Sequence, residues 1–337
     1  MNILIVGCGF AGATIGRTLA EAGHKINIID QRDHIAGNAY DHVNEHGIRV
    51  HQYGPHIFHT SNHKVVEWLS QFTEWVEYKH KVLAKVNPKE LHVLPVNKNT
   101  SSQYSLEKIL DTFYKPYTKK MWGLPLEQVN PKILERVPIR DDENDLYFPN
   151  DSFQAMPLHG YTEIFKNILN HPNIKVELSK KFDKNMEDEY EHCFNSMAID
   201  EYYEYCYGEL PYRSIKFQTV TLPEVQLYQT AVTNFTTATG PTRVTEWKHF
   251  SGLDQKNTTT LTYEFPCDYR ENNYERYYPI NDLAGENQKK YNEYKKIKNT
   301  KTTFIGRCGN YLYLDMHQVI SSSLATAQEF IQKSKPN

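Results

Sequence analysis

The feature that most constrains the fold is a glycine pattern near the start of the chain. Gly7, Gly9 and Gly12 form a G-x-G-x-x-G turn directly after the apolar run 3–6 and before the helix-forming run 13–22. In such a turn the first glycine permits a tight bend, the second lets the backbone approach a pyrophosphate, and the third lets helix and strand pack closely. The N-terminus of the helix also favours an anion. The pattern therefore predicts a β-α-β unit that binds a dinucleotide.

Two further segments favour a flavin dinucleotide over a nicotinamide one. The strand 25–30 ends in Asp30, whose carboxylate can accept hydrogen bonds from ribose hydroxyls, and Arg32 and a small-residue turn at 36–39 follow it. Near the other end, the segment 306–309 lies between a strand and a helix. The N-terminus of that helix could stabilise negative charge on a reduced flavin. We therefore predict FAD as the cofactor.

The rest of the chain alternates helical and extended patterns. Apolar residues recur at helical spacing in 65–72 and 106–113, and the closing segment 315–330 is also helical in pattern. Residues 82–96 have the pattern of a hairpin, and residues 214–264 that of a mostly antiparallel sheet rich in Thr, Val, Tyr and Phe. The last strand and helix resemble partners of the first β-α-β unit, so we expect domains that interleave along the chain.

Composition excludes several classes of protein. The net charge of the 337 residues is -3, so no overall positive field would attract nucleic acid. The mean hydropathy is -0.67, and no apolar run approaches the roughly 20 residues of a membrane-spanning helix. Because Met1 leads almost at once into the first strand, we expect no signal peptide and a cytoplasmic protein without membrane insertion.

Side chains that commonly bind metals form no known pattern. The five cysteines include no C-x-x-C pair, which argues against a disulfide framework or a cysteine zinc site. Six histidines lie between positions 42 and 63, but their spacing matches no zinc signature. We therefore predict no metal.

Beyond these patterns, the chain resembles the UDP-galactopyranose mutase family along nearly its whole length. The resemblance rests on the glycine turn and on the stretches 34–40, 53–60, 117–123, 136–140, 277–280 and 313–317. Any one of these stretches could be chance, but together and in this order they are specific to the family.

The resemblance implies an isomerase that interconverts UDP-galactopyranose and UDP-galactofuranose without net redox change. Reduced flavin N5 would attack the anomeric carbon with UDP as the leaving group, so FAD would need an external reductant such as NADPH. Such a reaction serves cell-surface polysaccharide biosynthesis. UDP-N-acetylgalactosamine and UDP-arabinopyranose remain open as substrates, because a single acetamido or hydroxymethyl contact decides between them.

The resemblance also implies roles for individual residues. The implied catalytic residues are Arg136, Arg243, His59 and Asp315, with the two arginines clamping the diphosphate. The implied substrate-binding residues are Phe113, Tyr117, Trp122, Tyr147, Tyr278, Tyr313 and His80. The implied cofactor-binding residues are Gly7, Gly9, Phe10, Ala11, Gly12, Asp30, Gln31, Asn38, His56, Ile57, Arg307, Asp315 and Met316. Taken alone, Trp122 is more often a core residue, and Asp315 is a favoured helix cap.

Together with the element pattern, the resemblance implies an α/β fold with three interleaved domains. The Rossmann-like FAD-binding domain would comprise 1–62, 160–205 and 300–337. A reduced helical domain at the substrate cleft would comprise 63–80 and 101–137. An antiparallel-sheet domain would comprise 81–100, 138–159 and 206–299.

The chain departs from the family pattern in three places. The segment between 97–100 and Tyr117 is shorter than in bacterial members, which puts their dimer contact, and so the oligomeric state, in doubt. His80 stands where the family usually has Asn, and 195–200 replaces a turn that contains Gly-Pro. These changes predict retuned substrate binding and a mild change in cofactor affinity.

Two other functions remain open. A flavin oxidase or monooxygenase would share the dinucleotide fold but would consume oxygen. A non-catalytic protein would bind a UDP-sugar or FAD without turnover. The fold alone excludes neither, because function depends on the site.

Overall fold

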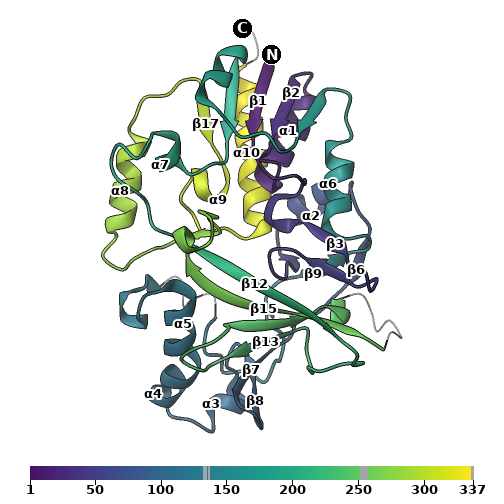
Figure 1. Cartoon of the computed structure of the whole chain (residues 1–337), viewed down its shortest axis with the longest axis vertical. Coiled ribbons are helices and arrows are strands. Elements are labelled where there is room, and N and C mark those ends of the chain that lie inside the picture. The colour runs from purple at the N-terminus through teal and green to yellow at the C-terminus, as the bar shows by residue number, and fades with distance from the viewer. Residues whose placement is uncertain (132–134, 136, 251–256, 335–337) are drawn as a thin grey trace.

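The computed structural model contains two main sheets with helices around them (Figure 1). It describes residues 1–131, 135, 137–250 and 257–334. Strand β1 (Asn2–Val6) and the last turns of helix α10 (Met316–Lys333) lie at the same end of the molecule. Among the described residues, no helix combines the length and the apolar character that crossing a membrane requires.

The first sheet consists of five parallel strands. Their order is β10 (Ile174–Glu177), β2 (Lys25–Ile29), β1, β11 (His192–Asn195) and β17 (Thr302–Phe304). One face packs on helices α1 (Phe10–Glu21), α6 (Tyr161–Leu169) and α10 (Met316–Lys333). The other face packs on the segment 182–190. Both faces are covered, which explains the continuous apolar run in β1. The predicted α/β class is confirmed.

The second sheet has seven strands and is mostly antiparallel. Its order is β16 (Tyr278–Pro279), β12 (Tyr212–Leu222), β15 (Thr259–Asp268), β14 (Arg243–Glu246), β13 (Val232–Phe235), β7 (Val82–Asn87) and β8 (Glu90–Leu94). The predicted hairpin at 82–96 and the predicted sheet at 214–264 are both confirmed. One pair, β13 with β7, is parallel. Sequence patterns do not predict that pair because its strands are far apart along the chain.

Short helices lie beside the end of the second sheet that carries β7 and β8 (Figure 1). They are α3 (Lys98–Ser101), α4 (Leu106–Ile109), a π-helical turn (Leu110–Tyr114) and α5 (Lys115–Trp122). Ser105 begins α4, since its side chain accepts a hydrogen bond from the amide of Lys108. Gly123 ends α5 with a φ of 72°, a conformation that favours glycine.

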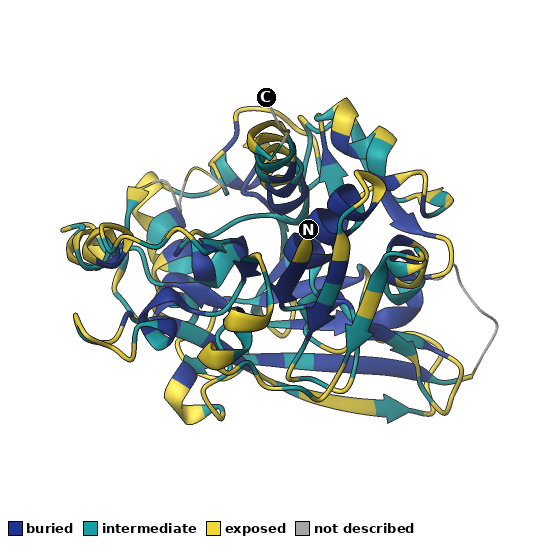
Figure 2. Ribbon diagram, turned by 90° about the horizontal axis from the view of Figure 1, so that it is seen from above, coloured by how far each residue is buried: buried dark blue, intermediate teal, exposed yellow. Residues whose placement is uncertain are grey.

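Smaller elements join the two main sheets. A two-stranded sheet pairs β3 (Asp41–Val43) with β4 (Arg49–His51). A three-stranded sheet has the order β5 (Phe58–Thr60), β9 (Phe153–Pro157), β6 (Trp75–Glu77). The remaining helices include α2 (His63–Leu69), α7 (Ile199–Tyr202), α8 (Glu286–Lys295) and α9 (Gly306–Gly309). Figure 2 shows the buried residues concentrated in the inner strands and the exposed residues on the outer helices. The division into three domains stays a prediction.

The junction between β3 and α6 depends on a buried carboxylate. Asp41 is 2% exposed, and it accepts hydrogen bonds from the amides of Tyr161 at 2.9 Å and Thr162 at 2.8 Å. These amides begin α6, so Asp41 satisfies donors that the helix cannot pair internally. Gly160 precedes them with a φ of +83°, and a Cβ there would lie 2.2 Å from Asp41 Oδ2.

We predict that Gly160→Ala destabilises the protein much more than Gly240→Ala. Gly240 has a similar φ of +85°, but a Cβ there would meet nothing within 4 Å. Both substitutions carry a backbone cost of about 1–2 kcal/mol, and overlap with Asp41 should add about 2 kcal/mol at Gly160. Urea unfolding of both variants measures the difference, and equal losses would contradict this account of Asp41.

Candidate active site

Two neighbouring cavities lie between the two main sheets. The first has a volume of about 590 Å³ and the second a volume of about 430 Å³. Both are lined by Asn38, His56, Tyr277, Arg307 and Met316. These five residues form a shared wall, so a molecule that fills the first cavity can present one end to the second.

The glycine turn forms one end of the first cavity. A Cβ on Gly7 would lie 2.0 Å from Ser196 Oγ, and a Cβ on Gly12 would lie 2.0 Å from the carbonyl oxygen of Gly7. The turn therefore needs glycine at both positions for packing, as the motif predicts. Gly12 does not line either cavity, and its assignment as a cofactor-binding residue stays a prediction. The carboxylate of Asp30 accepts the amide of Cys8 at 2.8 Å, which holds the turn against β2.

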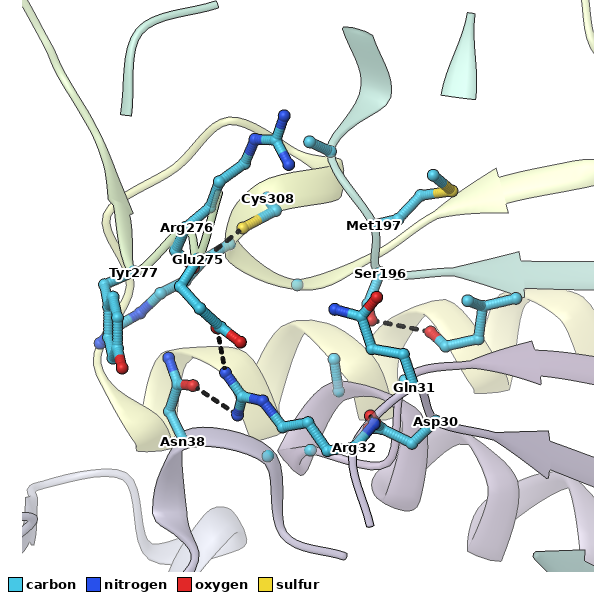
Figure 3. Close-up of a pocket in the computed structure, with 18 of the residues that line it drawn as sticks. Asp30, Gln31, Arg32, Asn38, Ser196, Met197, Glu275, Arg276, Tyr277 and Cys308 are labelled. Atoms are coloured by element: carbon cyan, nitrogen blue, oxygen red, sulfur yellow. Dashed lines mark hydrogen bonds and ion pairs between the residues drawn. The ribbon is translucent and has the colours of Figure 1, made fainter. Parts of the chain in front are cut away.

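An ion pair joins two distant segments across the first cavity (Figure 3). The guanidinium of Arg32 lies 2.7 Å from Glu275 and donates to Asn38 Oδ1 at 2.9 Å. It also lies over the ring of Tyr53, 4.3 Å from the centroid. Arg32, which lines the first cavity, thereby fixes Asn38 in the shared wall.

The second cavity contains a cation with a buried counterion. Arg243 Nε lies 2.8 Å from Glu264 Oε1, and the two residues are direct neighbours in the pairing of β14 with β15. Burial would lower the pKa of Arg243, but Glu264 raises it, so the guanidinium stays charged. Burial raises the pKa of Glu264, and Arg243 opposes that change. Glu264 is 1% exposed, while the arginine reaches the cavity.

Aromatic rings cover one side of the second cavity. Trp122 packs edge-on against Tyr278 and Tyr313, with centroid distances of 5.0 and 5.4 Å. The hydroxyl of Tyr278 donates to the carbonyl of Met121 at 2.7 Å, so its proton is already used within the protein. Tyr117 lies in the same cavity. Trp122 lines the cavity and also belongs to a core cluster, so its interpretation as a substrate contact is compatible with its interpretation as a core residue.

Three histidines line the second cavity in different environments. Burial lowers the pKa of His56 and of His80 to about 3, and positive Arg243 contributes to the shift at His80. Both rings are therefore neutral near pH 7. His59 differs, because its Nδ1 lies 2.6 Å from Asp151 Oδ2.

The structure brings most of the predicted site residues to the cavities. The second cavity is lined by Arg243, His59, Asp315, Phe113, Tyr117, Trp122, Tyr147, Tyr278, Tyr313 and His80. The first is lined by Gly7, Gly9, Phe10, Ala11, Asp30, Gln31, Asn38, His56, Arg307 and Met316. Ile57 lines the second cavity instead of the first. Asp315 also begins α10 as its N-cap. Arg136 lies outside the described residues.

Sequence reasoning missed three carboxylates at the site: Glu264, Glu275 and Asp151. Glu264 had a weak signal, because it interrupts an uncharged run from 257 to 267. Glu275 lies two residues before the stretch 277–280, and Asp151 had no sequence signal. Among the described residues, no group of three or more His, Cys, Asp or Glu side chains is placed to hold a metal ion.

Comparison with known proteins identifies relatives along the whole chain. A family model described as UDP-galactopyranose mutase matches residues 112–313, and one described as an NAD(P)-binding Rossmann-like domain matches residues 5–72. The dTDP-fucopyranose mutase of Escherichia coli is 35% identical over 380 aligned residues, which cover 99% of each chain. The UDP-galactopyranose mutase of Mycoplasma pneumoniae is 30% identical, with 98% of this chain and 96% of the relative covered.

Solved structures show the same fold. A reduced UDP-galactopyranose mutase matches with a TM-score of 0.72 at 15% identity, over 99% of this chain and 96% of that one. Putrescine oxidase matches with a TM-score of 0.59 at 11% identity, over 98% and 99%. Since a mutase and an oxidase both match, fold alone does not assign the reaction.

We predict that His80 makes the protein less stable in mild acid. Its pKa is about 3 in the folded protein, against an ordinary value of 6.5, so only the unfolded chain takes up the proton between these values. The stability that neutral His80 contributes is complete above about pH 6.5 and is lost as the pH falls towards 3. Between pH 7 and pH 5, wild type should therefore lose about 1–2 kcal/mol more than His80→Asn.

Urea unfolding at pH 7 and pH 5 measures these losses. His63→Asn, at an exposed position, is the matched control and should lose as much as wild type. An equal pH dependence in wild type and His80→Asn would contradict a neutral, buried His80.

Proposed function

Because the chain belongs to the UDP-galactopyranose mutase family, we propose that it interconverts the pyranose and furanose forms of a nucleotide-linked sugar, with UDP-galactose as the first candidate. The observation that carries the proposal is the shared wall between a dinucleotide cavity and a second cavity that holds Arg243. This arrangement lets a cofactor ring meet a sugar whose diphosphate is bound at the arginine.

The first cavity suits FAD. Gly7 and Gly9 let the backbone approach a pyrophosphate, Asp30 can accept from a ribose, and Asn38 and Arg307 would meet the flavin end at the shared wall. Reduced FAD, when bound, supplies a nucleophilic ring nitrogen for the anomeric carbon. The chain's own residues then have to bind the nucleotide, orient the sugar and stabilise the diphosphate that leaves.

Arg243 is the residue that we assign to the diphosphate. A guanidinium presents several donors to phosphate oxygens, and it stabilises the charge that develops as the sugar–phosphate bond breaks. Glu264 fixes its position through the 2.8 Å ion pair before any substrate binds. Such preorganisation means that little rearrangement is required during the reaction.

The aromatic residues of α5 and the π-helical turn before it would hold the nucleobase. Tyr117 and Trp122 can stack on a planar ring, and Phe113 extends the same wall. The sugar would then lie between Arg243 and the shared wall, near His59 and Asp315.

A dTDP-linked 6-deoxy sugar is a second candidate substrate. The relative from Escherichia coli is named for dTDP-fucopyranose. Beside Phe113, the second cavity is lined by Val82, Leu94 and Val232, all buried and apolar. Such a wall suits the 5-methyl group that distinguishes thymine from uracil.

Turnover measured with both nucleotide sugars tests the proposal. The purified protein, oxidised or reduced with dithionite, would be incubated with UDP-galactofuranose or with the furanose form of dTDP-fucose, and the products separated by chromatography. We expect conversion to the pyranose form only after reduction. Flavin-bound protein that converts neither sugar in either state would contradict the proposal, and oxygen consumption would favour an oxidase.

We further predict that Arg243→Ala lowers turnover of the reduced protein at least about tenfold, because the leaving diphosphate loses a preorganised charge. Arg270→Ala is the matched control, since Arg270 pairs with Asp268 on the surface and does not line either cavity. Its turnover should equal that of wild type. Equal rates in Arg243→Ala and wild type would refute the assignment of Arg243 to the diphosphate.

A further inference from the structure

We propose that Asp151 is a positioning residue that holds His59 as the group exchanging protons with the sugar hydroxyls during the change of ring size. The proposal rests on the mutase function proposed above and extends it to a residue pair. Asp151 has no assigned role in the sequence analysis, and it does not itself line the second cavity.

The pairing of β5 with β9 brings the two residues together. His59 lies in β5 opposite Gln154 of β9, and Asp151 lies just before β9 begins. The carboxylate oxygen Oδ2 is 2.6 Å from His59 Nδ1. The side chains are partly buried, with exposed fractions of 13% for the histidine and 27% for the aspartate, so the contact is partly shielded from water.

A second set of bonds fixes the segment that carries Asp151. Ser61, which follows β5, donates its hydroxyl to the carbonyl of Asn150 at 3.2 Å. The same hydroxyl accepts the amide of Ser152 at 3.1 Å. Asp151 is therefore held from both sides by the strand end that carries His59, which gives its carboxylate a fixed position.

Stacking fixes the plane of the histidine ring. The rings of His59 and Phe148 lie 3.4 Å apart at an angle of 9°, and His317 approaches His59 edge-on at 5.7 Å. Phe148 sets the plane of the ring, and Asp151 sets its rotation by engaging Nδ1. The nitrogen on the opposite edge, Nε2, is then the one available to the second cavity, which His59 lines together with Arg243.

The pairing separates His59 from the other histidines of the cavity. His56 and His80 are buried and neutral, with pKa values lowered to about 3 mainly by burial, so neither can readily carry a proton near pH 7. His59 has a carboxylate on Nδ1. A carboxylate in that position orients the ring and leaves Nε2 as the nitrogen that faces the substrate, as in other His–Asp pairs.

The change of ring size requires a group that first donates a proton and then takes one up. When the six-membered ring opens, the electron pair of the bond between C1 and the C5 oxygen stays on that oxygen, which takes a proton from Nε2 of His59; the nucleophilic ring nitrogen of reduced FAD, when bound, would supply C1 with the electron pair that it loses. When the five-membered ring closes, an electron pair of the C4 oxygen forms the new bond to C1, the pair lent to C1 goes back to that nitrogen, and the proton of the C4 hydroxyl returns to Nε2. No net proton is gained or lost, so one histidine can serve both steps.

Variants of both partners test the proposal in the reduced enzyme with UDP-galactofuranose. Asp151→Asn keeps the size of the side chain but removes the charge. We expect its kcat to fall roughly tenfold or more while KM and the affinity for UDP stay within about twofold. Asp151→Glu should recover part of the loss. The matched control is Asp145→Asn, which removes a carboxylate paired with Lys81 on the surface and should keep the wild-type kcat.

A double-variant cycle distinguishes positioning from independent action. If Asp151 acts through His59, the variant with both Asp151→Asn and His59→Gln should be no slower than His59→Gln alone. Additive losses, or a wild-type kcat in Asp151→Asn, would overturn the proposal while the mutase function stands. Flavin absorbance and urea unfolding show whether each variant is folded and loaded. A wild-type enzyme without turnover on either nucleotide sugar would instead refute the mutase function, and this proposal with it.

Discussion

The close approach of α1 to the glycine turn is the contact on which the rest of the structure depends. A Cβ on Gly12 would lie 2.0 Å from the carbonyl oxygen of Gly7, so the helix can approach the turn this closely only because Gly12 lacks a side chain. This contact sets where α1 crosses the parallel sheet, and α6 and α10 then pack on α1. The position of the first cavity, and of the shared wall beside it, follows from that packing.

The active site is assembled by segments that are far apart in the sequence. The shared wall takes Asn38 and His56 from the first quarter of the chain and Tyr277, Arg307 and Met316 from its last fifth. Segments so distant converge because β17 completes the parallel sheet while β12 and β15 carry the second sheet across the molecule (Figure 1). The chain thus brings these side chains to the place where, in the proposed function, the dinucleotide and the nucleotide sugar would meet.

The individual turns and strands could be predicted from the sequence, but the ion pairs between distant residues could not. The glycine turn, the apolar strands and the Thr-rich strands have patterns with a fixed physical meaning, so their elements were predictable. The pair of Arg32 and Glu275 spans 243 positions, and the pair of Arg243 and Glu264 depends on the register of two strands. Sequence patterns do not show the register in which distant strands pair, so the ion-pair partners of the predicted arginines became visible only in the structure.

The polarity of the second cavity supports the orientation proposed for a nucleotide sugar. Val82, Leu94 and Val232 give the cavity an apolar part of its lining that suits a base, whereas an unpaired charge against it would lose its solvation. Arg243 supplies a paired cation to the same cavity, where the proposed diphosphate would bind. In that proposal the sugar lies at the shared wall near His59. The proposed placement of base, diphosphate and sugar thus follows from where the chain buries charge and where it does not.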